Sequence, residues 1–201
     1  MKKILFLSAA VATLGLAAFT VIDDLQIGSS LPKADVKMKD VSGKEITLKS
    51  AMGKNGLLVM FSCNTCPYVV KNQARTKENA AAALSKNIGV VLVNSNEAQR
   101  GDDDSYDAMK AYAKEQGYRW SYVVDQNSVI ADAFGAKKTP ECFLFDNGGK
   151  LVYHGAIDDS PSNPDAVSRQ HLKVAMEELV AGKEVSVKTS SSVGCGIKRN
   201  S

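Results

Sequence analysis

The chain has 201 residues, 44% hydrophobic and 23% charged, which is the balance of a globular protein with one domain of ordinary size and excludes intrinsic disorder. There are 25 Lys and Arg against 22 Asp and Glu, and two of the lysines lie in an expected leader, so the remaining chain is almost neutral. We therefore expect no nucleic-acid partner and no broad basic surface for an anionic membrane.

The first 22 residues have the form of a bacterial export signal. Lys2 and Lys3 precede the apolar stretch Ile4–Ile22, which contains no charged residue. Cleavage is expected after Ala17 or Thr20, although this stretch is also just long enough for an uncleaved membrane anchor. We expect a periplasmic or otherwise extracytoplasmic protein that contacts the membrane only through this segment, if it is retained.

The first half of the body alternates strands and helices. Alternating apolar residues around Val41–Lys44 predict a β-hairpin. Two continuous apolar runs, Leu57–Phe61 and Ile88–Val93, predict strands that are buried on both faces. The Ala-rich segment Val69–Lys86 between them predicts a helix, and Ser105 is expected to cap the next one.

The second half continues this alternation. Three further strands are expected at Tyr118–Val124, Phe143–Phe145 and Leu151–Tyr153. A short helix is predicted at Val129–Phe134, and a last helix is expected to open at Asn163–Pro164 and to end at Gly182. From Glu184 onward no periodicity remains, so the tail is expected to be extended or mobile.

This order of elements predicts an α/β fold with a central mixed, mainly parallel sheet, helices on both faces and an N-terminal β-hairpin. We divide the chain into a signal peptide or anchor at 1–22, one domain at 27–183 and the tail at 184–201. The acidic run Asp102–Asp104 lacks the spacing and the glycine of a calcium loop. It is expected to be a solvated approach to the following helix.

Cys63 and Cys66 are separated by two residues at the point where a buried strand runs into a helix. Unpaired N–H groups at a helix N-terminus favour a negative charge, and such placement lowers a cysteine pKa from about 8.5 to roughly 3.5–7.5. We therefore expect Cys63 to be the attacking thiolate. Cys66, one turn further and more buried, would resolve the mixed disulfide, and Pro67 fits the first helical turn.

Metal binding and a purely structural disulfide are the alternatives for this pair. A single Cys-x-x-Cys pair is half a zinc site, and no second pair follows at the required spacing. His154 and His171 stand alone and are expected to be structural. The redox interpretation is favoured.

The segment around this pair, Phe61–Val69, and five further segments strengthen this interpretation, namely Val93–Asn96, Thr139–Glu141, Phe143–Asp146, Tyr153–Asp159 and Val193–Lys198. With them the chain resembles the thioredoxin superfamily, and more closely its redoxin or peroxiredoxin-like branch, the alkyl hydroperoxide reductase/thiol-specific antioxidant group. The resemblance implies a thioredoxin-like fold. It also implies that Thr139 and Pro140 form a cis-proline loop, which faces the thiols and offers main-chain groups to an extended partner.

The chain departs from the family pattern at several positions. Leu57 and Ser62 stand where thioredoxins have a buried acid and a Trp, so the acceptor for the Cys66 proton is unidentified. Met60 stands where the threonine of a peroxiredoxin would precede Cys63, which puts a dedicated peroxidase activity in doubt.

Two cysteines lie outside the motif. Cys142 falls in a predicted central strand and is expected to be a small buried hydrophobe. Cys195 lies in the Gly-flanked tail, where the expectations are a structural disulfide, most plausibly with Cys142, an additional redox thiol, or a free thiol.

The expected function is that of an exported thiol-disulfide oxidoreductase using Cys63 and Cys66. Its partners would be protein thiols or disulfides and a thiol reductant or oxidant, and neither an organic cofactor nor a metal is expected. Two alternatives use the same thiols, a thiol-dependent peroxidase with a sulfenic acid on Cys63 and a periplasmic Cu(I) carrier.

Overall fold

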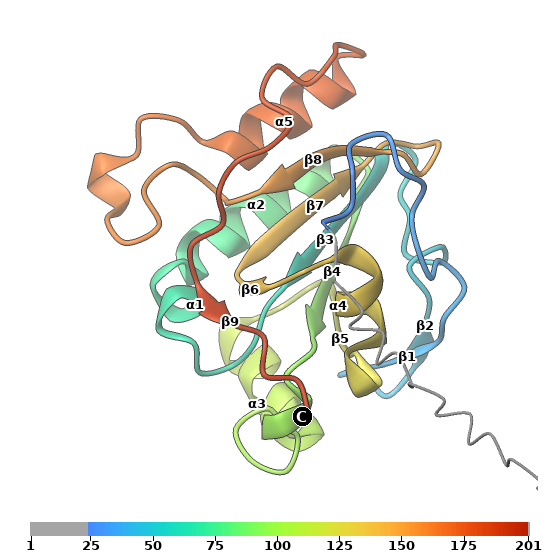
Figure 1. Ribbon diagram of the computed structural model, residues 1–201, viewed down its shortest axis with the longest axis vertical. Helices are drawn as coiled ribbons and strands as arrows, with labels where there is room; N and C mark the ends of the chain where they lie inside the picture. The colour runs from blue at the N-terminus through green and yellow to red at the C-terminus, as the bar shows by residue number, and fades with distance from the viewer. Residues whose placement is uncertain (1–23, 201) are drawn as a thin grey trace, which may run out of the picture.

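A seven-stranded mixed sheet forms the centre of the protein (Figure 1). The structure, a computed structural model, describes residues 24–200, so the expected leader at 1–22 lies outside the described residues. No helix in this described part is long and apolar enough to cross a membrane. The strand order is β2-β1-β5-β4-β3-β7-β8.

The strands of this sheet are β1 (Met38–Asp40), β2 (Glu45–Ile46), β3 (Gly56–Phe61), β4 (Ile88–Asn94), β5 (Ser121–Val124), β7 (Glu141–Phe145) and β8 (Leu151–Gly155). Parallel pairing is confined to the three central strands β3, β4 and β5. The hairpin β1–β2 adds antiparallel to β5, and β7 and β8 add antiparallel beyond β3. Strands joined by a tight turn can pair only antiparallel, so the predicted hairpin and the last two strands make the sheet mixed. Four of its six strand pairings are antiparallel, so the expectation of a mainly parallel sheet was wrong.

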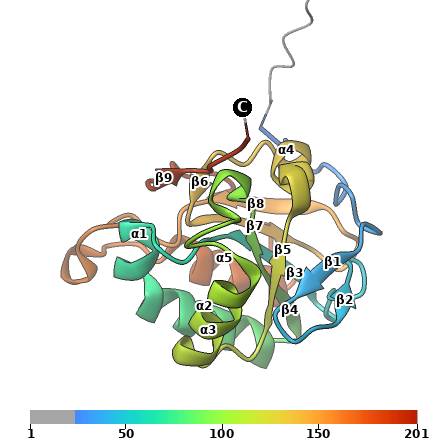
Figure 2. The ribbon, with the colours of Figure 1, turned by 90° about the horizontal axis from the view of Figure 1, so that it is seen from below.

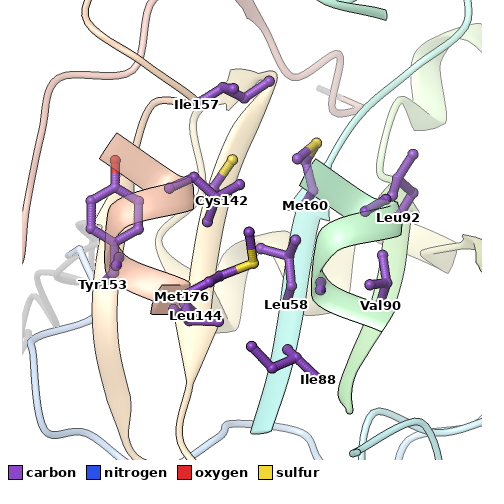
Figure 3. Packing of buried hydrophobic residues seen from close by; sticks show 14 of the residues in the cluster. Leu58, Met60, Ile88, Val90, Leu92, Cys142, Leu144, Tyr153, Ile157 and Met176 are labelled. Carbon is purple, nitrogen blue, oxygen red and sulfur yellow. The ribbon is translucent and has the colours of Figure 1, made fainter. Parts of the chain in front are cut away.

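Helices cover both faces of the sheet, as predicted (Figure 2). They are α1 (Pro67–Lys71), α2 (Gln73–Ser85), α3 (Tyr106–Gln116), α4 (Val129–Phe134) and α5 (His171–Val180). Leu58 and Met60 of β3 pack with residues of α2, α3 and α5 on one face (Figure 3). Leu57 and Val59 pack with α4 on the other. Because successive side chains of a strand point to opposite faces, one apolar run supplies both cores.

The ends of α3 and α4 follow the predicted signals. The backbone N–H of Ala108 donates to Oγ of Ser105 at 3.3 Å, which confirms Ser105 as the N-cap of α3. Gly117 ends α3 and Gly135 ends α4, with φ values of 69° and 67° in the left-handed region that glycine tolerates.

The predicted helix Val69–Lys86 is divided by Asn72 into α1 and α2. The Asn72 side chain donates to the carbonyl oxygen of Tyr68 at 2.7 Å and to that of Pro161 at 2.9 Å. An asparagine side chain that bonds to main-chain groups competes with helical hydrogen bonding. This contact also ties α1 to the loop before α5.

The last helix begins at His171 rather than at Asn163–Pro164. Asn163 caps only the 3₁₀ turn Pro164–Ala166, and the chain is then extended. The Asp159 carboxylate accepts hydrogen bonds from the N–H groups of Ser168 and Arg169, both at 3.0 Å. Because both N–H groups bond to the Asp159 side chain, α5 starts later in the chain than predicted.

The tail is extended and lies along the domain. The Lys188 carbonyl accepts from the His154 N–H at 2.9 Å, and the Ser190 N–H donates back to the His154 carbonyl at 3.1 Å. Further on, β9 (Cys195–Gly196) pairs antiparallel with β6 (Lys138–Thr139) in a separate two-stranded sheet. Figure 1 shows the tail in red, running from α5 to β9 beside β6.

Candidate active site

The two motif cysteines lie in the loop that follows β3. The Ser62 N–H donates to the Val93 carbonyl at 2.9 Å and extends the β3–β4 pairing by one residue. The loop therefore starts at the carboxyl end of the parallel strands. Cys63 is 2% exposed and Cys66 is 5% exposed, so Cys66 is not the more buried thiol, contrary to expectation. Both pack against Val69 of α1.

Helix α1 begins at Pro67, and its N-cap is Cys66 rather than Cys63. Cys66 has φ −60° and ψ 124°, which is extended backbone. The ring of a proline disfavours the helical conformation at the preceding residue, so no helix here can start before Pro67. This signal was present in the sequence, and the expectation that Cys63 lies at the helix N-terminus was wrong.

The proton distribution between the thiols follows from this geometry. A hydrogen bond from the Cys63 thiol is the main cause that lowers the pKa of Cys66 well below its ordinary value. Burial opposes this shift, and the Cys195 thiol and the N–H of Val69 add to it. The pKa of Cys63 is raised, because its thiol donates to Cys66 and because it is buried. The two cysteines therefore share one proton, and the lowered pKa of Cys66 favours this sulfur as the thiolate, whereas the sequence pointed to Cys63.

The loop at Thr139 and Pro140 faces these thiols, and its peptide bond is cis, as the resemblance implied. Oγ1 of Thr139 lies 3.5 Å from Sγ of Cys63. The Cys66 thiol, when protonated, donates to the Thr139 carbonyl at 3.3 Å. The structure thus brings together four of the expected site residues from segments more than 70 residues apart.

Glu141 holds the shape of this loop. One oxygen of its buried carboxylate accepts from the N–H groups of Lys137 and Lys138 at 2.8 and 2.9 Å. The other lies 2.8 Å from Nε2 of His154, whose ring stacks on Phe143 with 4.1 Å between centroids. These contacts give His154 the structural role that was expected.

Asp104 is a site residue that we had misassigned. Its side chain, expected to be solvated, is fully buried. It accepts hydrogen bonds from the Asn64 N–H at 2.9 Å, from the Asn94 side chain at 2.7 Å and from the Asn96 side chain at 2.8 Å. Asp104 therefore anchors the cysteine loop to the end of β4. A run of aspartates has no local feature that marks which one turns inward.

Asn64, the residue after Cys63, is held by its backbone N–H and by both polar atoms of its side chain. Its side-chain N–H donates to the Asp103 carbonyl at 2.7 Å, and its side-chain oxygen accepts from the Tyr122 hydroxyl at 2.9 Å. With the bond to Asp104, these contacts fix the loop between the cysteines from three sides. The sequence marked Asn64 only as an uncharged residue of the motif.

The remaining cysteines lie in different places. Cys142 in β7 is fully buried among Met60, Leu144 and Ile157 (Figure 3). Burial raises its pKa, in agreement with a small buried hydrophobe. Cys195 pairs with Thr139 and packs beside Cys66. All four cysteines are free thiols, and the structure does not bring Cys142 and Cys195 together.

Between residues 24 and 200, no group of three or more His, Cys, Asp or Glu is arranged to hold a metal ion. The chemistry that the arrangement offers is that of a dithiol with one stabilised thiolate.

Comparison with known proteins gives the family. The Redoxin family model matches residues 26–169. A hypothetical protein from Sinorhizobium meliloti 1021 is 32% identical with a TM-score of 0.81, over 89% of this chain and 97% of that one. An uncharacterized conserved protein from Geobacillus kaustophilus is 31% identical with a TM-score of 0.81, over 93% and 98%. Thiol-disulfide oxidoreductase ResA of Geobacillus thermodenitrificans is 24% identical over 154 residues, which is 74% of this chain and 79% of that protein. This chain belongs to the redoxin family of the thioredoxin superfamily.

Proposed function

We propose that the protein is a thiol-disulfide oxidoreductase in which Cys63 and Cys66 exchange electrons with thiols or disulfides of partner proteins. The observation that carries this proposal is the contact of two buried thiols at the end of β3, with donors arranged around one thiolate. Membership of the redoxin family and the similarity to ResA support the same class of reaction. The two sulfurs hold the exchanged electron pair themselves, so the reaction needs no organic cofactor.

Cys66 attacks and Cys63 resolves in this proposal, which reverses the order expected from sequence. The thiolate is the nucleophile, and the lowered pKa keeps Cys66 ionised at neutral pH. Attack on a partner disulfide forms a mixed disulfide with Cys66 and releases the partner's other sulfur as a thiolate. Cys63 then loses its proton, attacks Sγ of Cys66 and frees the second partner thiol. The partner gains two electrons, and the protein keeps a Cys63–Cys66 disulfide.

Thr139 and Pro140 provide the docking edge for the partner. Thr139 lies in β6, and its carbonyl oxygen is 3.3 Å from Sγ of Cys66. An extended segment that replaces β9 on this strand would hold its own sulfur beside Cys66. Main-chain pairing does not depend on the partner's side chains, so this edge would not restrict the partner's sequence.

Export to the periplasm or another extracytoplasmic compartment is part of the proposal. It is supported by the basic start and the apolar run of residues 1–22. Fusing these residues to alkaline phosphatase, which is active only outside the cytoplasm, tests it. Phosphatase activity is expected, and its absence would contradict export.

Trapping of the mixed disulfide tests the reaction and the order of attack together. Cys63→Ser and Cys66→Ser are each made in a Cys195→Ser background, so that no third thiol can resolve the complex. We expect wild type to reduce the disulfides of insulin and only the Cys63→Ser protein to accumulate a mixed disulfide. Accumulation only in the Cys66→Ser protein would restore the opposite order, and no reduction by wild type would refute the function.

A further inference from the structure

The tail occupies the strand edge on which a partner would dock. Thr139 pairs with Cys195 and Lys138 with Gly196, in antiparallel register. The Ile197 N–H donates to the Lys137 carbonyl at 3.1 Å and extends this pairing by one residue. The polar main-chain edge beside the thiols is therefore covered by residues of the same chain (Figure 1).

Gly194 allows this close approach. A Cβ atom at this position would lie 2.1 Å from the Thr139 carbonyl oxygen and 3.3 Å from the Pro140 nitrogen. Real Cβ atoms do not come so close to a backbone oxygen. The tail can therefore cross the loop at this depth only with glycine immediately before Cys195.

Bonds on either side of Cys195 hold the tail in place. After it, the Lys198 N–H donates to the Asn96 side-chain oxygen at 2.9 Å, and the Arg199 guanidinium binds Asp132 at 2.8 Å. Before it, the Ser190 hydroxyl accepts from the Ala156 N–H at 3.0 Å. The sulfur of Cys195 is thus presented from a fixed segment.

Cys195 belongs to the thiol cluster. It packs against the group formed by Cys63, Cys66 and Val69 and is only partly buried. The proximity of the two thiols contributes to the lowered pKa of Cys66 and to the raised pKa of Cys195. The cluster therefore contains three thiols, with Cys66 next to the other two.

We propose that Cys195 is a third redox thiol, for which the tail serves as a built-in partner strand. The proposal rests on the proposed function, which supplies the oxidised Cys63–Cys66 pair. Cys195 loses its proton and attacks Sγ of Cys66, so that a Cys66–Cys195 bond forms and the Cys63–Cys66 bond breaks. Cys63 leaves as a thiolate and takes up a proton, and no electrons are gained or lost.

The surroundings of Cys195 change in favour of this step when the pair is oxidised. In the reduced protein, burial and then the neighbouring Cys66 raise the pKa of Cys195, while Lys198 opposes them. Once Cys66 is in a disulfide, it is no longer a thiolate that can share the proton of Cys195. The contribution of Cys66 to the raised pKa of Cys195 is then lost. Cys195 then ionises more readily at the moment when a disulfide is next to it.

The exchange has a consequence for partner binding. A Cys66–Cys195 disulfide fixes the tail covalently over β6, which closes the docking edge until a reductant breaks the bond. It also leaves Cys63 as the free thiol. The oxidised protein would thus exist in two forms, one with the tail held on β6 only by hydrogen bonds and one with the tail fixed covalently, and the two forms have different free cysteines.

The free cysteine of oxidised wild type provides the test. The full chain is oxidised with oxidised glutathione, quenched in acid and unfolded, and its free thiols are alkylated and mapped by mass spectrometry. We expect a substantial fraction of molecules with alkylated Cys63 and a Cys66–Cys195 disulfide. If only Cys195 and Cys142 are alkylated and the only disulfide found is Cys63–Cys66, the inference is overturned.

A variant isolates the new bond. Cys63→Ser, oxidised with diamide, is expected to form an intramolecular Cys66–Cys195 disulfide and to lose two hydrogen atoms by mass. Cys63→Ser with Cys195→Ser should not, whereas Cys63→Ser with Cys142→Ala should. Insulin reduction by wild type is measured in parallel. If wild type reduces insulin but neither test finds the Cys66–Cys195 bond, only this inference fails, whereas loss of both removes the proposed function.

Discussion

Cys142 and Cys66 are about equally removed from solvent, at 0% and 5% exposure, yet their surroundings act in opposite directions. Cys142 lies among apolar side chains in β7, where burial raises its pKa. At Cys66, after the end of β3, the neighbouring Cys63 thiol is the main cause that lowers the pKa, and the Cys195 thiol and the backbone N–H groups of Val69 and Cys195 add to it. Burial alone therefore does not determine the chemistry of a cysteine, because the donors around the sulfur decide which form is stable.

The same contrast holds for the parts of the sheet in which these cysteines lie. Leu58 and Met60, in the middle of β3, are surrounded by apolar side chains. Asn94 at the carboxyl end of β4 and Asp104 shortly before α3 are equally buried but hydrogen-bonded to each other. Asn94 also bonds to Tyr122, and Asp104 to Asn64. The first region stabilises the fold by burial of apolar surface, and the second fixes the position of the cysteine loop.

Replacing Cys66 and Cys142 in turn is expected to give the largest difference between the two surroundings. Cys66→Ser should lower insulin reduction roughly a thousandfold or more, because it removes the attacking sulfur. Cys142→Ala should keep the activity and cost about 1–2 kcal/mol of stability, because it leaves a small cavity. Turnover assays and urea unfolding measure both. Equal loss of activity in the two variants would show that the thiols are not functionally distinct.

Replacing Asp104 tests whether its buried carboxylate holds the cysteine loop in place. Asp104→Ala leaves donors of Asn64, Asn94 and Asn96 without their acceptor and should cost about 3–5 kcal/mol in the free energy of unfolding. Its exposed neighbour offers a matched control, since Asp102→Ala should change stability by less than about 0.5 kcal/mol. Similar values for the two variants in urea unfolding would mean that Asp104 does not anchor the loop.

The smallest expected effect is a change in the pKa of Cys66, which titration of the thiolate measures. Since the pKa of Cys66 is lowered, the thiolate absorbance near neutral pH should persist below the ordinary thiol range and disappear as the pH falls through that lowered value. Cys63→Ala removes the main donor and should move the midpoint upward by about one pH unit or more. Cys195→Ala should cause a smaller upward shift, and Cys142→Ala none. A midpoint unaffected by Cys63→Ala would contradict the shared proton.

Some features of the site were predictable only in part. The cysteine pair at the end of a buried strand follows from the apolar run before Cys63, and the cis peptide at Pro140 followed from the family resemblance rather than from any local pattern. The helix start at Pro67 could have been derived, since proline restricts the residue before it. The inward turn of Asp104 could not, because its partners Asn64 and Asn94 come from two other segments.

The sequence by itself determined the strands of the seven-stranded sheet, the hairpin, the cap of α3, the glycines that end α3 and α4, and the dithiol motif, because periodicity, glycine conformation and capping act over a few neighbouring residues. Tertiary structure alone decided that Cys66 has the lowered pKa, that Asp104 is buried and that Cys195 lies beside Cys66 rather than near Cys142. These properties depend on which residues come into contact when the strands and the tail pair. Such contacts follow from the packing of whole elements and cannot be derived from a local sequence pattern.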